Sequence, residues 1–586
     1  MFGKIVGTLN NNCIRVINTS KSVELSLINI HVIFSKDYSK IVGVIQNISQ
    51  EYIDILIIGE IVNDKFLIGD IKKPSLDSRC RLILKNELES ILGTQNLYDR
   101  ERLLIGNSEI YNNINVTVDK NSFFSSNFAI LGNTGSGKSC GLARILQNNF
   151  YYNSNLKPVN AHFVIFDAYG DHRNAFENFN NIDGLNFKRI AFESNDNDVE
   201  SIKIPSYFLD VEDLAILLDI NTPELLPTIE NTLRIAYIFT SKDNMGLEYQ
   251  NNIIARSLLE ILSSGKTPTQ IRDQIIAVLS KFSTKDLNLD TIISQPGYDR
   301  TLRQCLSIDN QGKINAMNLI VELLSKYVNK EFDNMDIEPG FIYTLDDLYE
   351  ALEFSLINEG ILSSTVSFDK LNILRVRLRA IINSNLRKIF DFDKVVTPQE
   401  YVERFFKNEK GNNCQIVDLN FGNLDDRNSK IISKILSKLF FSFVTKLSIR
   451  GSYPIHIIIE EAHRYVQNDK DINILGYNIF ERIAKEGRKY GILLGLVTQR
   501  PVELSKTVLS QCSNYIVYKM IYPDDLDVVM SLSTNITSSL RDRLKVFHPG
   551  MALCFGTSFV MPVIVRFSLP NPLPTSESIK VTRLWY

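Results

Sequence analysis

A glycine-rich segment that joins a short apolar run to a helix-forming stretch constrains this chain more than any other feature. It matches the pattern G-x-x-x-x-G-K-S/T, with Gly132, Gly137, Lys138 and Ser139 at the fixed positions. Glycines let successive backbone N–H groups curl around an anion, and the positive end of the following helix points at that anion. A plain flexible glycine–serine loop is the alternative, but the apolar run at 128–131 and the helical pattern after the loop favour a phosphate site.

The pattern also gives roles to individual residues of this phosphate loop. Lys138 is expected to reach the β- and γ-phosphates of a nucleotide, and the Ser139 hydroxyl is expected to ligate Mg²⁺. The residues expected to bind ATP are Gly132, Asn133, Thr134, Gly135, Ser136, Gly137, Lys138, Ser139 and Cys140. The sequence therefore predicts ATP and Mg²⁺ as cofactors.

Length and charge exclude some classes of protein. The 586 residues are enough for two or three domains, and 44% hydrophobic with 22% charged residues is typical of a globular protein. The net charge of −3 does not indicate a nucleic-acid binder. If DNA is the partner, basic groups must be concentrated locally, for instance in a pore.

The cysteines and the N-terminus bear on the compartment. Seven cysteines are scattered without a C-x-x-C pair, which predicts neither a disulfide framework nor a zinc site and favours a reducing, cytoplasmic setting. The N-terminus lacks the charged-then-apolar build of a signal peptide, and no apolar run approaches the roughly 20 residues that span a bilayer. We expect a soluble cytoplasmic protein without a membrane segment.

Residues 1–95 read as a small all-β domain. Short β-branched runs alternate with Asn, Gly, Ser and Asp, at a spacing that suits a small barrel. No residue in this part carries recognisable chemistry. A docking or assembly role is therefore expected for this domain.

The pattern changes at about residue 96 to strand–loop–helix units, and residues 96–175 are expected to form the first part of an α/β core. After the phosphate loop and its helix, an apolar run at 161–166 ends in Asp167. Acidic residues at the carboxyl end of a parallel strand lie where ligands bind in open α/β sheets. The alternative is that Asp167 caps the next helix.

Residues 176–404 show apolar positions at helical spacing in several long segments, which predicts a helical insertion into the core. Within this insertion lies the densest basic stretch of the chain. Its members are Arg375, Arg377, Arg379, Arg387 and Lys388. These side chains are interpreted either as a nucleic-acid contact or as a solvated helix face or subunit contact.

The α/β pattern returns in residues 405–570, and residues 571–586 are read as a C-terminal tail. An isoleucine-rich run at 455–459 ends in the paired acids Glu460 and Glu461. We expect Glu460 to hold the magnesium ion, usually through water, and Glu461 to orient and deprotonate the attacking water. Many such strands end in Asp-Glu, so the first acid here is one methylene longer. A strand end with two exposed acids is the alternative.

Two further residues follow the acidic pair. Gln499 ends the next apolar run and is placed to sense the γ-phosphate. Arg488 lies in a helix end before that run, and its fixed charge is a candidate arginine finger for the site of a neighbouring subunit. Compensation of the helix dipole is the alternative for Arg488.

Taken together, these motifs resemble one known family. The strings that carry the resemblance are the phosphate loop at 127–139, Asp-x-x-Gly-Asp at 167–171, Glu-Glu-Ala-His at 460–463, Glu-Gly-Arg-Lys-Tyr-Gly at 486–491, and Thr-Gln-Arg-Pro-x-Glu-Leu-Ser-x-x-Val-Leu-Ser-Gln-Cys at 498–512. They are similar to the HerA branch of the HerA/FtsK ATPases. The resemblance covers the core and, more weakly, the N-terminal domain.

The resemblance implies a fold and an assembly. We expect an α/β protein with a RecA-like P-loop ATPase core, an N-terminal small β-barrel and a helical insertion, assembled as a homohexamer around double-stranded DNA with ATP between subunits. Roles in ATP turnover carry over onto Lys138, Ser139, Glu460, Glu461, Arg488 and Gln499. The chain departs from the family pattern at Asn127, where His is frequent, and by Glu–Asp exchanges at Asp171 and Glu460.

The resemblance also implies a partner, and two classes of function remain. Family members act with a nuclease in DNA end processing, or with a nuclease or sirtuin-like NADase effector in antiphage defence. The first hypothesis is an ATP-driven DNA translocase or helicase that docks such an effector. The second is a nucleotide-regulated hexameric scaffold that activates a partner enzyme without processive translocation.

Overall fold

The structure is a computed structural model of the chain. It describes residues 2–10, 12–20, 23–37, 39–69, 72–93, 96, 99–111, 114–151, 157–192, 199–240, 244–295, 297–330, 332, 342–362, 368–392, 394–468, 471–533, 536, 538–575, 582 and 585. The chain divides into two compact units. The first contains Met1–Glu200, Gln399–Asp469 and Asn478–Tyr586, and the second contains Ser201–Pro398 and Lys470–Tyr477.

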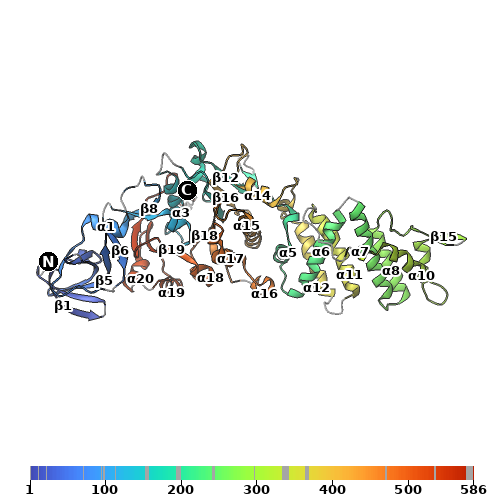
Figure 1. The fold of residues 1–586 in the computed structure, drawn as a ribbon, viewed down its shortest axis with the longest axis horizontal. Helices are drawn as coiled ribbons and strands as arrows, with labels where there is room; N and C mark the ends of the chain where they lie inside the picture. Colours follow the sequence, from blue (N-terminus) through green and yellow to red (C-terminus); the bar gives the residue numbers. More distant parts are fainter. Residues whose placement is uncertain are drawn as a thin grey trace. The chain divides into compact units, whose positions relative to one another are not determined.

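A twelve-stranded mixed sheet forms the centre of the first unit (Figure 1). Its order is β13 (Glu200–Ser201), β12 (Phe187–Ala191), β16 (Ile416–Asn420), β11 (His162–Asp167), β17 (Ile455–Ile459), β18 (Ile492–Thr498), β10 (Asn127–Leu131), β19 (Cys512–Val517), β20 (Met551–Gly556), β21 (Val563–Arg566), β8 (Arg102–Ser108) and β9 (Asn115–Asp119). The strands from β12 to β19 run parallel, and the pairs from β19 to β9 are antiparallel. The expected α/β P-loop core is confirmed.

The central strands are continuous apolar runs because they are covered on both faces. Every residue of β10, β11, β17 and β18 is buried. Helix α3 (Lys138–Tyr151) packs Leu142, Ile145 and Leu146 into the same core cluster as Ile130 of β10. The other helices of this unit are α1 (Lys85–Leu92), α2 (Lys120–Phe124), α4 (Arg173–Phe176), α14 (Pro398–Phe405), α15 (Asp426–Lys446), α17 (Ile479–Glu486), α18 (Lys506–Ser510), α19 (Pro523–Ser531) and α20 (Ser538–Val546).

The N-terminal part is a seven-stranded antiparallel sheet, in the order β1-β2-β5-β4-β3-β7 with β6 paired to β5. Its strands are β1 (Phe2–Asn10), β2 (Cys13–Asn18), β3 (His31–Lys36), β4 (Ser39–Ile48), β5 (Tyr52–Val62), β6 (Lys65–Ile68) and β7 (Arg79–Leu82). Alternate residues of β5 face a separate isoleucine-rich core. Along the described strands the hydrogen-bonded path runs from β1 to β7 without closing, so the expected barrel is an open one.

The second unit is mainly helical, as expected. It contains α5 (Val211–Leu217), α6 (Leu226–Thr240), α7 (Asn244–Ser263), α8 (Pro268–Phe282), α9 (Leu302–Cys305), α10 (Met317–Tyr327), α11 (Leu345–Leu362), α12 (Phe368–Ile382), α13 (Arg387–Phe390) and α16 (Asp471–Leu475), with a hairpin of β14 (Ile292–Gln295) and β15 (Tyr298–Thr301). It begins at Ser201, later than the sequence pattern suggests. The reason is that β12 joins the core sheet.

Two members of the basic stretch in this unit make local contacts. The Arg377 guanidinium donates to the carbonyl of Leu218, 2.7 Å away, just after the last turn of α5. Arg387 pairs with Asp346 in the first turn of α11 at 2.6 Å. A cation at helix-end carbonyls stabilises the helix that they end, and the ion pair of Arg387 joins two helices of the same unit. For these two arginines the structural interpretation is favoured over a nucleic-acid contact.

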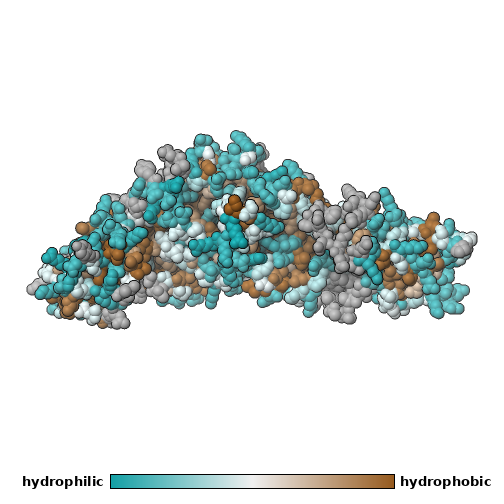
Figure 2. Space-filling view, viewed as in Figure 1, coloured by the Kyte–Doolittle hydropathy of each residue, from teal (hydrophilic) through white to brown (hydrophobic). Residues whose placement is uncertain are grey.

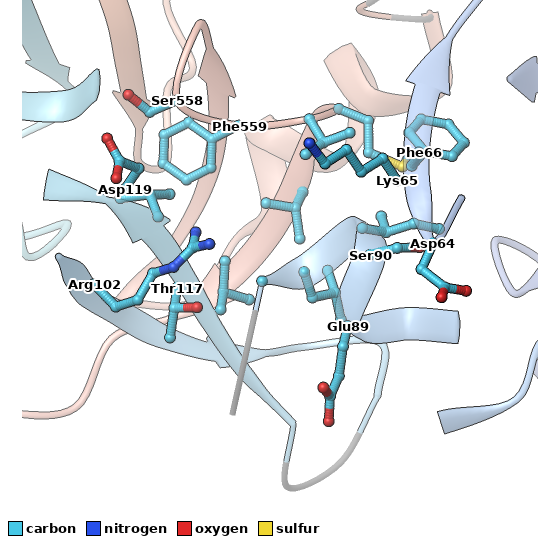
Figure 3. Close-up of a pocket in the computed structure, with 18 of the residues that line it drawn as sticks. Asp64, Lys65, Phe66, Glu89, Ser90, Arg102, Thr117, Asp119, Ser558 and Phe559 are labelled. Carbon is cyan, nitrogen blue, oxygen red and sulfur yellow. The ribbon is translucent and has the colours of Figure 1, made fainter. Parts of the chain in front are cut away.

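The N-terminal sheet and the core sheet enclose a cavity of about 510 Å³ (Figure 3). Phe66 of β6, residues of α1, and Phe559 in the β20–β21 connection line it, together with the cations Lys65 and Arg102. None of the residues predicted to bind nucleotide lines this cavity. On the same N-terminal part, Leu67 and Ile68 are exposed, and Figure 2 shows apolar surface interspersed with hydrophilic surface there.

No helix in the described portion of the chain is long and apolar enough to span a membrane.

Candidate active site

The phosphate loop joins β10 to α3, as the sequence predicts. Gly132, Gly135 and Gly137 adopt φ angles of 153°, 71° and 109°, which favour glycine because a side chain is strained there. A Cβ at Gly137 would also lie 3.1 Å from the backbone nitrogen of Gly550. The Gly550 N–H donates to the carbonyl of Ser136 at 3.0 Å. The loop is thus held by the segment that precedes β20.

Lys138 begins α3 and is buried, and its Nζ atom donates to the carbonyl of Asn133 at 3.1 Å. Burial lowers the pKa of Lys138, while the carboxylates of Glu461 and Glu460 oppose that shift. The lysine therefore folds back over the loop with two acids in electrostatic range. An ammonium in this position is available to a triphosphate.

The strand order explains how the acidic pair reaches the loop. Strand β18 lies between β10 and β17, and all three are parallel. Their carboxyl ends therefore meet at one edge of the sheet. Glu460, directly after β17, is buried, and the nearby Ser139 side chain helps to lower the pKa of its carboxyl. The structure brings Lys138, Ser139 and Glu460 together although the last two are 321 residues apart (460 − 139).

Oxygen donors at this point fit a hard divalent cation. The Ser139 hydroxyl and the Glu460 carboxylate are the ligand types that Mg²⁺ prefers, usually with water and phosphate oxygens completing the shell. The longer glutamate reaches the serine, so the extra methylene relative to aspartate is compatible with the site.

Glu461 has an unusual backbone, with φ 46° and ψ 46°. A left-handed conformation is uncommon for a residue with a side chain and is a known feature of functional sites. Its Oε2 atom lies 3.3 Å from Nδ1 of His463, without hydrogen-bond geometry. Burial raises the pKa of Glu461, with Lys138 opposing the shift. A carboxylate of raised pKa is the better proton acceptor for water.

Gln499 also reaches the loop. It directly follows β18, where Thr498 is in register with Leu131 at the end of β10. The Thr134 hydroxyl hydrogen-bonds the Gln499 side-chain oxygen. Gln499 therefore faces the phosphate loop, at the position that sensing of a γ-phosphate requires.

Arg488 is not brought to this edge. It is exposed, in the turn of Gly487–Lys489 that precedes the amino end of β18. The seven residues of β18 separate it from Thr498, a length of about 23 Å along a strand. In the described part of the chain Arg488 makes no hydrogen bond or ion pair. It cannot serve the phosphate loop of its own subunit.

His172 was not among the predicted site residues. Its imidazole is fully buried, and Nε2 lies 2.7 Å from Oε1 of Glu460. Burial would lower the pKa of His172, but the carboxylates of Glu460, Asp167 and Asp418 raise it to about 10. Burial likewise opposes ionisation of Glu460, yet the His172 charge lowers the pKa of that acid. The sequence signal was the histidine that directly follows Asp-x-x-Gly-Asp.

Comparison with known proteins finds similarity to the family that these motifs resemble. The model of the "Helicase HerA, central domain" family matches residues 103–330. A DNA double-strand break repair helicase HerA of Pyrococcus furiosus is 24% identical over 476 residues, which cover 80% of this chain and 70% of that protein. The protein of the same name from Sulfurisphaera tokodaii is 27% identical over 368 residues, covering 59% and 71%.

Solved structures were also matched, at lower similarity. The plasmid coupling protein TrwB in complex with a non-hydrolysable ATP analogue aligns with TM-score 0.39 and 11% identity, over 79% of this chain and 89% of that one. VirB4 of Thermoanaerobacter pseudethanolicus aligns with TM-score 0.40 and 11% identity, over 80% and 96%. On the family match and the curated relatives, residues 103–330 form a HerA helicase central domain, and the chain is similar to HerA-type ATPases over most of its length.

Proposed function

We propose that this chain is an ATP-driven DNA translocase or helicase that works as a ring of six copies. One observation carries the proposal. The groups needed for ATP turnover gather at one edge of the core sheet, while Arg488 lies at the opposite edge. Heterologous contacts between copies generate closed rings. Such a ring brings the finger of one subunit to the phosphates of the next.

The roles follow from the geometry. Ser139 and Glu460 would hold Mg²⁺, which would supply charge neutralisation at the phosphates. Lys138 leaves the Asn133 carbonyl to contact the β- and γ-phosphates. Glu461 positions the attacking water and accepts its proton. Gln499 exchanges its contact with Thr134 for one with the γ-phosphate, which couples hydrolysis to movement of β18.

The polynucleotide assignment rests on the relatives, and the partner assignment rests on the resemblance of the motifs to the HerA/FtsK ATPases. Proteins named as DNA double-strand break repair helicases align over most of this chain. We therefore assign duplex DNA to the central channel of the ring. A nuclease or sirtuin-like NADase effector docks on the ring, in DNA end processing or antiphage defence. The exposed apolar side chains of β6 suit such docking.

ATP turnover by the purified chain, measured with and without linear duplex DNA, tests this proposal. A translocase is stimulated by duplex DNA alone, and Lys138→Ala abolishes the turnover. Sedimentation should show a six-subunit species. If DNA has no effect and a partner protein alone stimulates turnover, the chain is a nucleotide-regulated scaffold. A chain that stays monomeric with ATP and DNA present contradicts the ring.

A further inference from the structure

The pair formed by His172 and Glu460 is a buried polar contact of the site. Their side chains are 0% and 5% exposed, and the contact measures 2.7 Å. Glu460 has one more rotatable bond than aspartate, so an unrestrained carboxylate would sample several rotamers. The contact with His172 removes that freedom at one oxygen. It leaves the rest of the carboxylate for Ser139.

The loop that carries His172 is itself held firmly. The Asp167 carboxylate accepts hydrogen bonds from the backbone N–H groups of Tyr169, Gly170 and His172, at 3.1, 2.8 and 2.9 Å. A Cβ at Gly170 would meet the Asn420 amide at 2.6 Å. The loop therefore closes against β16 and presents the imidazole to β17 in one orientation. The sequence left open whether Asp167 binds a ligand or caps the next helix. In the structure its carboxylate caps the turn that directly follows β11.

A metal ion shared by Asp167, His172 and Glu460 is a competing explanation, since their ligand atoms lie within 4.8 Å of one another. Two observations disfavour it. Both oxygens of Asp167 already accept backbone hydrogen bonds. Atoms that share one metal ion are about 3 Å or more apart, whereas His172 and Glu460 are at hydrogen-bond distance. The cluster is an internal polar network.

We propose that His172 is a positioning residue for ATP hydrolysis, which fixes the Glu460 carboxylate so that it and Ser139 present preformed oxygens to Mg²⁺. The inference rests on the proposed function, since it takes Glu460 as a magnesium ligand. Partners that orient a metal-binding side chain are worth about 10- to 100-fold in metal affinity or activity. His172 itself contacts neither nucleotide nor ion.

Two variants separate orientation from packing. His172→Phe keeps a ring of similar shape and removes the N–H donor, whereas His172→Gln keeps an N–H donor at nearly the same reach. The readouts are kcat and KM for ATP, the Mg²⁺ concentration that gives half-maximal turnover, and the affinity of a non-hydrolysable ATP analogue with and without Mg²⁺. Thermal unfolding of each variant is recorded alongside.

For His172→Phe we expect kcat to fall and half-saturating Mg²⁺ to rise by about 10-fold or more, with analogue affinity unchanged when Mg²⁺ is absent. His172→Gln should stay within about threefold of the unmodified protein. The inference is overturned if His172→Phe has the same magnesium dependence as the unmodified protein. It is also overturned if kcat falls equally in both variants while their unfolding temperatures stay unchanged. Failure of the proposed function is distinct, because then Glu460→Gln leaves turnover and the magnesium effect on analogue binding intact.

Discussion

The side-chain oxygen of Asn127 accepts a hydrogen bond from the backbone N–H of Leu494 at 2.9 Å, and its amide nitrogen donates to the carbonyls of Ala484 and Gln511 at 3.1 and 3.3 Å. Asn127 is buried at the start of β10. It ties the strand before the phosphate loop to β18 and to α17, the helix that precedes the turn of Arg488. Asn127 stands where the family frequently has histidine, and both polar atoms of its side chain have hydrogen-bond partners.

Removing this side chain should be costly. Asn127→Leu leaves one buried N–H and two carbonyls without partners, so we expect a loss of about 2–4 kcal/mol in the free energy of unfolding of the core. Denaturant unfolding followed by circular dichroism measures it. Asn127→Asp keeps the acceptor for Leu494 but sets a carboxylate oxygen against the carbonyls of Ala484 and Gln511, so it should be destabilised as well. Equal stability of Asn127→Leu and the unmodified chain would show that these bonds contribute nothing.

A second prediction concerns the helix after the phosphate loop. A Cβ at Gly141 would lie 1.8 Å from the hydroxyl oxygen of Tyr518, which is fully buried and cannot move aside. Gly141→Ala should shift the first turn of α3, weaken ATP-analogue binding about tenfold and destabilise the core by about 1–3 kcal/mol.

Tyr518→Phe should relieve part of that clash. The Tyr518 hydroxyl has no hydrogen-bond partner in the described structure, so its removal is nearly neutral alone. The double variant should recover part of the lost affinity, because the ring carbon still lies 2.8 Å from the added methyl. Strict additivity in the double-mutant cycle would contradict the contact.

Gln499 should affect turnover more than binding. Gln499→Leu removes the contact with the γ-phosphate that forms during hydrolysis, and we expect kcat to fall about 100-fold while ATP-analogue affinity changes little. Thr134→Val is the control, because it removes the hydrogen bond between Thr134 and Gln499 but leaves the Gln499 side chain in place. A Gln499→Leu chain with normal kcat would exclude the sensor role.

Arg488 should act between subunits. Arg488→Ala is expected to lower kcat about 1,000-fold or more while the ring still assembles. Co-expression with Lys138→Ala chains should restore turnover, since about a quarter of randomly mixed interfaces pair an intact lysine with an intact arginine. A chain that carries both substitutions should restore nothing when mixed with Lys138→Ala. No recovery in the first mixture would place the role of Arg488 elsewhere.

The elements that the sequence predicts well are those marked by continuous apolar runs or by periodic apolar positions. Glu460 and Lys138 were expected to meet because both follow apolar runs, and the carboxyl ends of parallel strands share one edge. The buried runs of β10, β17 and β18 gave strong patterns. The apolar periodicity of residues 176–404 likewise predicted that this part is mainly helical.

What sequence could not show depends on contacts between distant segments. Strand β12 is five residues long, and its pairing with β16 is made across more than 200 residues, so periodicity alone did not separate it from the insertion. Ile314 forms a bridge with Ile308, and α10 starts only at Met317. His172 lies in a turn, where no periodic pattern marks burial. Only its distance to Glu460 identifies it.

Buried histidines give the last prediction, a pH dependence of stability. His456 of β17 is buried, stacks on Phe163 and contacts the Phe124 carbonyl at 2.8 Å. Burial lowers its pKa to about 4, and burial does the same to His31 and His162. In the unfolded chain these histidines bind protons near the ordinary pKa of 6.5. The stability that the three buried neutral histidines contribute is therefore complete above that pH and is lost as the pH falls towards 4.

Each such histidine contributes a slope of about 1.4 kcal/mol per pH unit between these values. The midpoint of thermal unfolding should therefore fall steeply from pH 6 to 4. Above pH 7 these three histidines add no slope, whereas the raised pKa of His172 predicts a loss of stability as the pH rises. His456→Gln keeps a donor for the Phe124 carbonyl but does not titrate, so it should flatten the acid limb and leave the neutral region nearly unchanged. Calorimetry across this range checks both. An acid limb as steep in the variant as in the unmodified chain would mean that His456 is protonated in the folded state.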